Sequence, residues 1–305
     1  MSPQELTQYV KAEAKSLGFD VCGIARAERV PQEVSEALAH WVSEGKNGEM
    51  SYMERNSDKR IDPRELVLGC RSIISVALNY YPGELEKEPH IARYAFGKDY
   101  HKVVKDKLYL LLLSINKVKR VSGRPFCDSA PLLERFWAQQ AGIGWIGRNR
   151  QLIIPKAGSF FFLGELLIDA ELEYDTPFEK NFCGKCNACI NNCPTGALSD
   201  NGFDARKCLS YLTIEYRGEL PQDIGEKMGS CFYGCDRCLT ACPHNRFSKA
   251  NNTAEFSPKN EIIVKKIEEW ESLTPEEYKI LFTGSAVERC GYEQLTRNIK
   301  AIKSK

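Results

Sequence analysis

The sequence predicts a mixed α/β (α+β) protein in which an α/β domain precedes a cysteine-rich module and a helical tail. Strand and helix patterns alternate over the first 170 or so residues, which is typical of an α/β domain. Nine of the thirteen cysteines then fall between Cys183 and Cys242, in a loop-rich stretch. From Ser257 onward the chain is rich in Lys and Glu and predicts helices. We therefore expect three parts, at residues 1–172, 173–250 and 251–305.

Apolar periodicity and turn residues define the elements of the first part. Helices are expected at residues 5–16, 32–44, 101–121 and 131–141. Strands are expected at residues 21–25, 71–80 and 160–169. No GxGxxG follows the first strand, so an ordinary dinucleotide-binding fold has no support.

Composition excludes several classes of protein. A net charge of +1 gives no global attraction to nucleic acid or to an anionic membrane, so a nucleic-acid partner would need a local basic patch. The longest apolar run, Leu108 to Leu113, is too short to cross a bilayer, and the N-terminus lacks a signal-peptide pattern. We expect a soluble, cytoplasmic protein.

Two cysteine motifs carry the strongest chemical signal. The first runs from Cys183 to Pro194 with the spacing C-x2-C-x2-C-x3-C-P of bacterial ferredoxins. Three thiolates of such a motif hold one [4Fe–4S] cluster, and the fourth reaches a second cluster. The second motif, from Cys235 to Pro243, lacks one ligand, which Cys208 can supply. The sequence therefore predicts two clusters and one-electron redox chemistry.

The ligand count closes at eight cysteines. We assign cluster one to Cys183, Cys186, Cys189 and Cys242, and cluster two to Cys193, Cys208, Cys235 and Cys238. Cys231, four residues before Cys235, is a rival for the last position. Zinc bound by the paired CxxC units is an alternative, but it leaves the two Cys-Pro cysteines unexplained. Cys22, Cys70 and Cys290 are expected in the core, and Cys127 in packing or beside a cofactor.

A simple electron carrier needs only a short chain, so the preceding domain is expected to hold a second redox centre or a substrate site. Two passages have a suitable composition: residues 93–101, and residues 126–135 followed by the glycine-rich 142–149. Each also has a structural explanation. Asp128 and Ser129 would cap a helix beginning at Pro131, an interpretation that the residues alone favour. Asp99 would cap the helix after it, His101 would be a surface or core histidine, and Glu134 and Arg135 would form a solvated face.

Taken together, several passages resemble the epoxyqueuosine reductase family over essentially the whole chain. They are residues 59–63, 99–101, 128–135, 142–149, 208–215 and the two cysteine motifs. The resemblance implies an oxidoreductase that reduces epoxyqueuosine to queuosine at the wobble position of tRNA, the last step of queuosine biosynthesis, using cobalamin (as cob(II)alamin) and two [4Fe–4S] clusters. It also implies a nitroreductase-like cobalamin domain and a ferredoxin-like cluster module, in a fold related to reductive dehalogenases.

The family's proton-donating aspartate maps onto Asp128. Opening an epoxide leaves an alkoxide, so a carboxylic acid at the ring oxygen is a suitable general acid if burial raises its pKa enough to keep it protonated. Cluster electrons are expected to reduce the cobalt while Asp128 donates the proton, and water then leaves. No histidine lies in a DxHxxG context, so we expect no histidine ligand to cobalt. The expected cofactor contacts are Arg60, Ala95, Asp99, Tyr100, Asp128, Gly147, Ser159 and Gly164.

Many family members continue past the region of Arg297 into a helical-repeat domain, whereas this sequence stops at Lys305, so we expect a short form. Its tail, with Arg289, Arg297, Lys300, Lys303 and Lys305, would be a phosphate patch or a solvated helix end.

The expected partners are tRNA bearing epoxyqueuosine in its anticodon loop and an external low-potential electron donor, with no membrane and a monomeric state. Two alternatives stay open: a dehalogenase-like corrinoid reductase of a small molecule with a closed hydrophobic pocket, and a non-enzymatic electron-transfer or cobalamin-handling protein.

Overall fold

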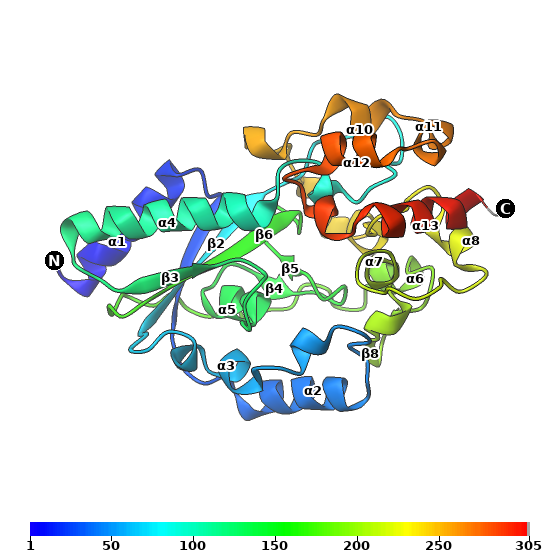
Figure 1. Ribbon diagram of the computed structural model, residues 1–305. Helices are drawn as coiled ribbons and strands as arrows, with labels where there is room; N and C mark the ends of the chain where they lie inside the picture. The colour runs from blue at the N-terminus through cyan, green and yellow to red at the C-terminus, as the bar shows by residue number, and fades with distance from the viewer. Residues whose placement is uncertain (304–305) are drawn as a thin grey trace.

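The computed structural model describes residues 1–303 and is built around a four-stranded sheet (Figure 1). The strand order is β1 (Val21–Arg26), β2 (Ser72–Asn79), β6 (Phe161–Ile168) and β3 (Gly123–Phe126). All three pairings are antiparallel. The predicted mixed α/β class is confirmed, and the antiparallel pairing makes it an α+β arrangement.

Helices cover both faces of this sheet. Helices α1 (Pro3–Ser16) and α4 (Tyr100–Val118) pack on one face, and α5 (Glu134–Gln140) packs on the other. The predicted apolar stripe of α4 is buried against the sheet from Val104 to Ile115. Gly164 of β6 lets α4 approach closely, because a Cβ there would lie 2.5 Å from Cγ1 of Val104.

Most predicted boundaries differ by only a few residues from those observed. Helix α1 begins at Pro3 because Ser2 and Glu5 form a capping box, and α2 spans Gln32–Ser43. The helix expected from Pro131 is the main correction. It begins at Glu134, because residues 127–133 form tight turns in which Asp128 has a φ of +56°. Strand β3 was not predicted; it contains Pro125, which suits its position at the sheet edge.

The rest of the chain forms short elements. The first part adds α3 (Ser57–Ile61) and the hairpin β4 (Trp145–Ile146) with β5 (Leu152–Ile153). The cysteine-rich part holds α6 (Ala188–Asn191), β7 (Leu198–Ser199), β8 (Gly202–Phe203), α7 (Leu209–Ile214), α8 (Ile224–Met228) and α9 (Arg237–Thr240). The tail holds α10 (Asn260–Val264), α11 (Ile267–Glu271), α12 (Pro275–Phe282) and α13 (Tyr292–Lys303).

The tail helices share a hydrophobic core with the cysteine-rich part. Trp270 and Phe282 are fully buried there beside Phe232, and α13 packs on α7 and α8. The core also takes in Phe96, which lies just before α4. The tail therefore holds the segment before α4 against the cysteine-rich part. Within residues 1–303, no helix has the length and apolar character needed to cross a membrane.

Candidate active site

The four cysteines predicted for cluster one line a single hollow. Cys183, Cys186 and Cys189 come from the first motif, and Cys242 comes from the second. Helices α6 and α9, which belong to the two motifs, pack against each other and bring the motifs together. Four thiols on one hollow are a donor set that fits an iron–sulfur cubane.

The four cysteines predicted for cluster two also lie near one another. Burial raises the pKa of Cys235 to about 11, and the neighbouring Cys208 contributes to the rise. Burial likewise raises the pKa of Cys238, with contributions from Cys235 and Cys208, while the pKa of Cys208 is raised by burial and by Cys193. Such shifts indicate thiols that would be neutral without a metal and that iron binding would convert to thiolates.

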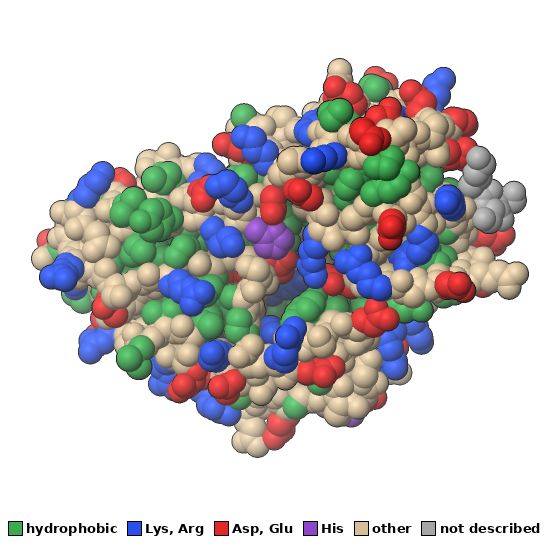
Figure 2. Space-filling view, in the orientation of Figure 1, with side chains coloured by type: hydrophobic (Ala, Val, Ile, Leu, Met, Phe, Trp, Pro, Cys, Tyr) green, Lys and Arg blue, Asp and Glu red, His purple; other side chains and the backbone are tan. Residues whose placement is uncertain are grey.

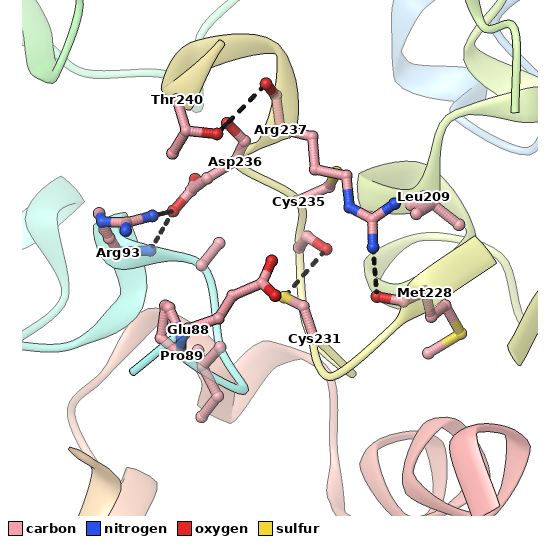
Figure 3. Close-up of a pocket in the computed structure, with 13 residues that line it drawn as sticks. Glu88, Pro89, Arg93, Leu209, Met228, Cys231, Cys235, Asp236, Arg237 and Thr240 are labelled. Atoms are coloured by element: carbon pink, nitrogen blue, oxygen red, sulfur yellow. Dashed lines mark hydrogen bonds and ion pairs between the residues drawn. The ribbon is translucent and has the colours of Figure 1, made fainter. Parts of the chain in front are cut away.

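Cys231 lies beside Cys235 in a hollow that Arg93 and Asp236 also line (Figure 3). Its Sγ donates to the carbonyl oxygens of Tyr233 at 3.4 Å and Gly234 at 3.6 Å. Burial raises its pKa. These contacts engage Cys231 as a protonated thiol and favour Cys208 as the fourth ligand of cluster two.

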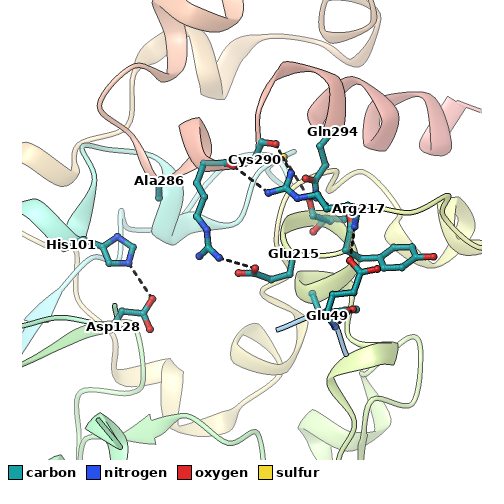
Figure 4. Close-up of polar contacts among 12 residues, drawn as sticks. Glu49, His101, Asp128, Glu215, Arg217, Ala286, Cys290 and Gln294 are labelled. Atoms are coloured by element: carbon teal, nitrogen blue, oxygen red, sulfur yellow. Dashed lines mark hydrogen bonds and ion pairs between the residues drawn. The ribbon is translucent and has the colours of Figure 1, made fainter. Parts of the chain in front are cut away.

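The second predicted site converges on Asp128, which follows β3. Oη of Tyr100 donates to Oδ2 of Asp128 at 2.5 Å. Nε2 of His101 lies 3.3 Å from the same oxygen, and the two side chains face each other (Figure 4). The other ring nitrogen of His101, Nδ1, lies 2.7 Å from Oδ1 of Asp99. A histidine with a carboxylate at each nitrogen is arranged to carry a positive charge.

The structure decides between the interpretations of these residues as helix caps or solvated side chains and as members of a site. Asp99 does cap α4, because it accepts from the His101 backbone N–H at 3.0 Å. Asp128 does not cap α5: the N-cap of that helix is Leu133, and within residues 1–303 no side chain makes a capping hydrogen bond there. Glu134 is not a solvated side chain either, since an oxygen of its carboxyl group accepts a hydrogen bond from the backbone N–H of Asp128.

The protonation of Asp128 differs from the expectation. Partial desolvation by the neighbouring side chains acts to raise its pKa, but hydrogen bonds from His101 and Tyr100 and the charge of His101 lower it to about 2. Burial acts to lower the pKa of His101, but hydrogen bonds to Asp128 and Asp99 raise it to about 9. The side chain of Asp128 is 57% exposed, so water reaches it. The proton of this pair therefore resides on His101, and Asp128 is a carboxylate.

One face of the molecule is hollowed near its middle, where basic and acidic side chains gather (Figure 2). The exposed side chain of Asp128 lies opposite Glu215, and the site hollow is the space between them (Figure 4). Across from Asp128, Nη2 of Arg289 donates to Oε2 of Glu215 at 2.8 Å. Burial raises the pKa of Tyr52, and the charges of Glu215 and Asp128 add to the rise. Arg289 lies close enough to Tyr52 for its positive charge to act against this rise. Segments around residues 52, 128, 215 and 289 therefore meet at one site.

The predicted cofactor contacts divide into two groups. Asp99, Tyr100 and Asp128 meet at the hollow. Arg60 donates to the carbonyl of Tyr52 at 2.9 Å, and its buried Nε has no partner among the described residues. An exposed site with a buried, unpaired guanidinium donor on the neighbouring segment fits a large polar cofactor such as a corrin. The other four are engaged in packing or in hydrogen bonds to neighbouring segments: Ala95, Gly147, Ser159 and Gly164.

The basic residues of the tail, for which a phosphate patch and a solvated helix end were both open, differ in their contacts. Arg297 donates to the carbonyl oxygens of Leu212, Tyr216 and Gly218, so its side chain ties α13 to the end of α7. Arg289 faces the hollow and is paired with Glu215. The side chain of Lys303 and the whole of Lys305 lie outside the described residues.

Among the residues that the structure describes at or near this site, Tyr52, Glu165, Glu215 and Arg289 were not predicted as site residues. Arg289 was noted only as part of a basic tail. Glu165 sits in a strand of apolar residues, and an acidic residue in such a run was a signal that could have been followed.

Comparison with known proteins agrees with this arrangement. Residues 60–129 match a family model described as Epoxyqueuosine reductase QueG, DUF1730, and residues 182–245 match one described as a 4Fe-4S double cluster binding domain. An epoxyqueuosine reductase of Leadbetterella byssophila is 44% identical over 98% of this chain and 99% of its own length. The epoxyqueuosine reductase of Escherichia coli is 39% identical over 97% of this chain and 80% of its own length.

Solved structures give the same result. A crystal structure of epoxyqueuosine reductase with an epoxyqueuosine-modified stem loop of tRNA-Tyr has a TM-score of 0.89 and 29% identity, covering 99% of this chain and 81% of that one. A structure from Bacillus subtilis, with its aspartate-bearing catalytic loop swung out of the active site, has a TM-score of 0.87 and 28% identity, covering 99% and 82%. The chain belongs to the epoxyqueuosine reductase family and is therefore an oxidoreductase with an iron–sulfur module.

Proposed function

We propose that this chain reduces epoxyqueuosine to queuosine in the anticodon loop of tRNA, the last step of queuosine biosynthesis, with cobalamin and two [4Fe–4S] clusters as cofactors. The observation that carries the proposal is the position of Asp128, held by Tyr100 and His101 at an open hollow. Relatives that match nearly the whole chain support it.

Electrons enter through the cysteine-rich part. We assign Cys183, Cys186, Cys189 and Cys242 to cluster one and Cys193, Cys208, Cys235 and Cys238 to cluster two. An external low-potential donor supplies the electrons. The clusters belong to residues 173–250 and cobalamin to residues 1–172, with the tail packed on both.

The side chains around Asp128 handle the proton. Cobalamin, when bound, supplies the reducing chemistry at the epoxide carbon. Asp128 faces the epoxide oxygen, where negative charge develops as the ring opens. In the open hollow its proton resides on His101. Covering the hollow with cofactor and nucleoside removes water from the exposed carboxylate, raises the pKa of Asp128, and shifts the proton from His101 toward it.

The openness of the site favours a macromolecular substrate. A small-molecule reductase would need a closed hydrophobic pocket, whereas the carboxylate of Asp128 is 57% exposed and is faced by Tyr52 and Arg289. A nucleotide presented by an anticodon loop can reach such a hollow from outside. The base and sugar would then find aromatic and cationic groups across from the acid.

The test uses anaerobic protein reconstituted with iron, sulfide and cobalamin, a strong reductant, and tRNA from cells blocked at the epoxide stage. Nucleosides from the digested tRNA are identified by mass spectrometry, and the loss of one oxygen is the expected result. Asp128→Asn should abolish conversion with iron and corrin contents unchanged. Asp106→Asn, an exposed residue of α4 paired with Lys102, is the matched control and should retain activity. No conversion by a fully loaded wild-type protein would overturn the proposal and favour a small-molecule substrate.

A further inference from the structure

A carboxyl group that the mechanism above does not use lies inside the sheet. Glu165 occupies the middle of β6 and is completely buried. It pairs across the sheet with Ser75 of β2 and with Phe126 of β3. No donor among the described residues reaches either of its carboxyl oxygens, and Oγ of Ser75 is likewise buried and unpartnered. A buried carboxylate without partners is costly, so a proton on Glu165 is strongly favoured.

Glu165 has a carboxyl neighbour that reaches the catalytic loop. Glu134, the first residue of α5, lies near enough to Glu165 for its charge to raise the pKa of that carboxyl group, and it accepts the backbone N–H of Asp128. Burial and the charge of Asp128 raise the pKa of Glu134 to about 8, and burial and Glu134 raise that of Glu165. Arg135 is the cation that faces Glu134, and the buried Cys127 lies beside both carboxyl groups.

The reaction requires more protons than the His101–Asp128 pair holds. Converting an epoxide to an alkene breaks two C–O bonds, forms one π bond and releases the oxygen as water. The balanced reaction consumes two electrons, which the external donor supplies, and two protons. His101 and Asp128 share a single proton between them. The second proton is needed when the hydroxyl group leaves as water, while the hollow is still covered.

We propose that Glu134 and the buried Glu165 form a proton store that supplies the second proton to Asp128, with Glu134 as the group that transfers it. The proposal rests on the function proposed above. Glu134 is placed for this role because it already contacts the Asp128 backbone, while Glu165 lies behind it in the sheet. The proton moves from the Glu134 carboxyl to the Asp128 carboxylate, and Glu165 then shares its proton with Glu134. Both are positioning residues, because they act through Asp128.

Infrared spectroscopy of the loaded enzyme tests the store without reference to turnover. Wild-type protein at pH 7 should show the carbonyl stretch of protonated carboxylic acids, and the band should shift in deuterium oxide. The band should weaken in Glu134→Gln and in Glu165→Gln and be lost in the double variant. Glu171→Gln, an exposed residue near Arg71, should leave it unchanged. Absence of the band in wild-type protein, or its persistence in the double variant, would overturn the proposal.

Single-turnover measurements test the transfer. Glu134→Gln retains an acceptor for the Asp128 backbone N–H, so it removes the proton while keeping the contact. The rate of queuosine formation should fall roughly 10- to 100-fold, with KM for tRNA unchanged. Wild-type activity should decline as pH rises through about 8, where Glu134 loses its proton, and this step should be missing from the variant. An unchanged rate and pH profile would refute the transfer, whereas queuosine formation by wild-type protein would leave the proposed function intact.

Discussion

The hydroxyl of Tyr100 donates to Oδ2 of Asp128 at 2.5 Å, across 28 residues of sequence. The ring of Tyr100 stacks on Phe162 with 4.3 Å between centroids, which fixes the direction of the hydroxyl. Burial and the charge of Asp128 raise the pKa of Tyr100, so it stays a donor at every physiological pH. The orientation of Asp128 therefore depends on how α4 packs on β6.

Replacing Tyr100 tests this dependence. Tyr100→Phe removes a hydrogen bond to a charged carboxylate, a loss of about 1.5–3 kcal/mol, and should raise the pKa of Asp128. Turnover should fall by roughly one order of magnitude, because the loop that carries Asp128 is less well held. Carboxyl carbon NMR titration measures the pKa. Tyr109→Phe, at an exposed position of the same helix, should change neither quantity.

The His101–Asp128 pair predicts a pH window. The folded-state pKa of His101 is raised from 6.5 to about 9, so its stabilisation is complete below about 6.5 and lost as pH rises through about 9. The pKa of Asp128 is lowered from 3.8 to about 2, so its contribution is present above about 3.8 and lost as pH falls through about 2.

His101→Gln should remove the alkaline loss of stability near pH 9, as seen in unfolding midpoints measured across pH. Proton NMR of the imidazole gives the pKa directly. His40→Gln is a suitable control, because His40 is 74% exposed and lies on α2, away from Asp128. A pKa near 6.5 for His101 in the wild-type protein would contradict the ion pair.

The cluster assignment predicts different iron contents for the serine variants of Cys208 and Cys231. Cys208→Ser should lose cluster two and roughly half of the iron, because serine is a poor ligand for this cluster. Cys231→Ser should retain both clusters, since Sγ of Cys231 is already engaged with the carbonyls of Tyr233 and Gly234. Iron analysis and electron paramagnetic resonance distinguish the two variants. Equal losses would show that Cys231 is a ligand.

A substitution at Gly164 tests whether this residue serves the packing of α4 or contacts the cofactor directly. A Cβ at this position would lie 2.5 Å from Cγ1 of Val104 and 3.0 Å from Cδ1 of Leu108, so α4 would have to shift. Gly164→Ala should lower the free energy of unfolding by about 1–3 kcal/mol. Because α4 carries Tyr100 and His101, turnover should fall with it. Loss of corrin without any loss of stability would instead indicate a direct cofactor contact.

The cluster module is the part that could be predicted most fully from sequence. In its first motif only two residues lie between each cysteine and the next over the first three thiols, so the spacing alone brings these thiols to one site. The start of α4 was predicted to within one residue, because Asp99 supplies a local cap. Such features depend on contacts between residues that are close together in the sequence, and sequence patterns reflect contacts over that short separation.

The role of Asp128 could not be predicted in the same way. Its residue type suits both a helix cap and a catalytic acid, and the residues alone favoured the cap. Tertiary structure decided the matter, because Tyr100 and His101 are brought to it by the packing of α4 on the sheet. The resemblance to a family indicated the correct residue, but not that its proton resides on His101.

The same distinction holds for charges. The sequence determined that Glu165, Arg289 and Arg297 carry ionisable groups, and the apolar run around Glu165 predicted a strand. Their environments came only from the fold: Glu165 is buried behind Glu134, Arg289 faces the hollow, and Arg297 binds backbone carbonyls. The energy of a charge depends on every group within several ångströms of it, and those groups come from segments far apart in the chain.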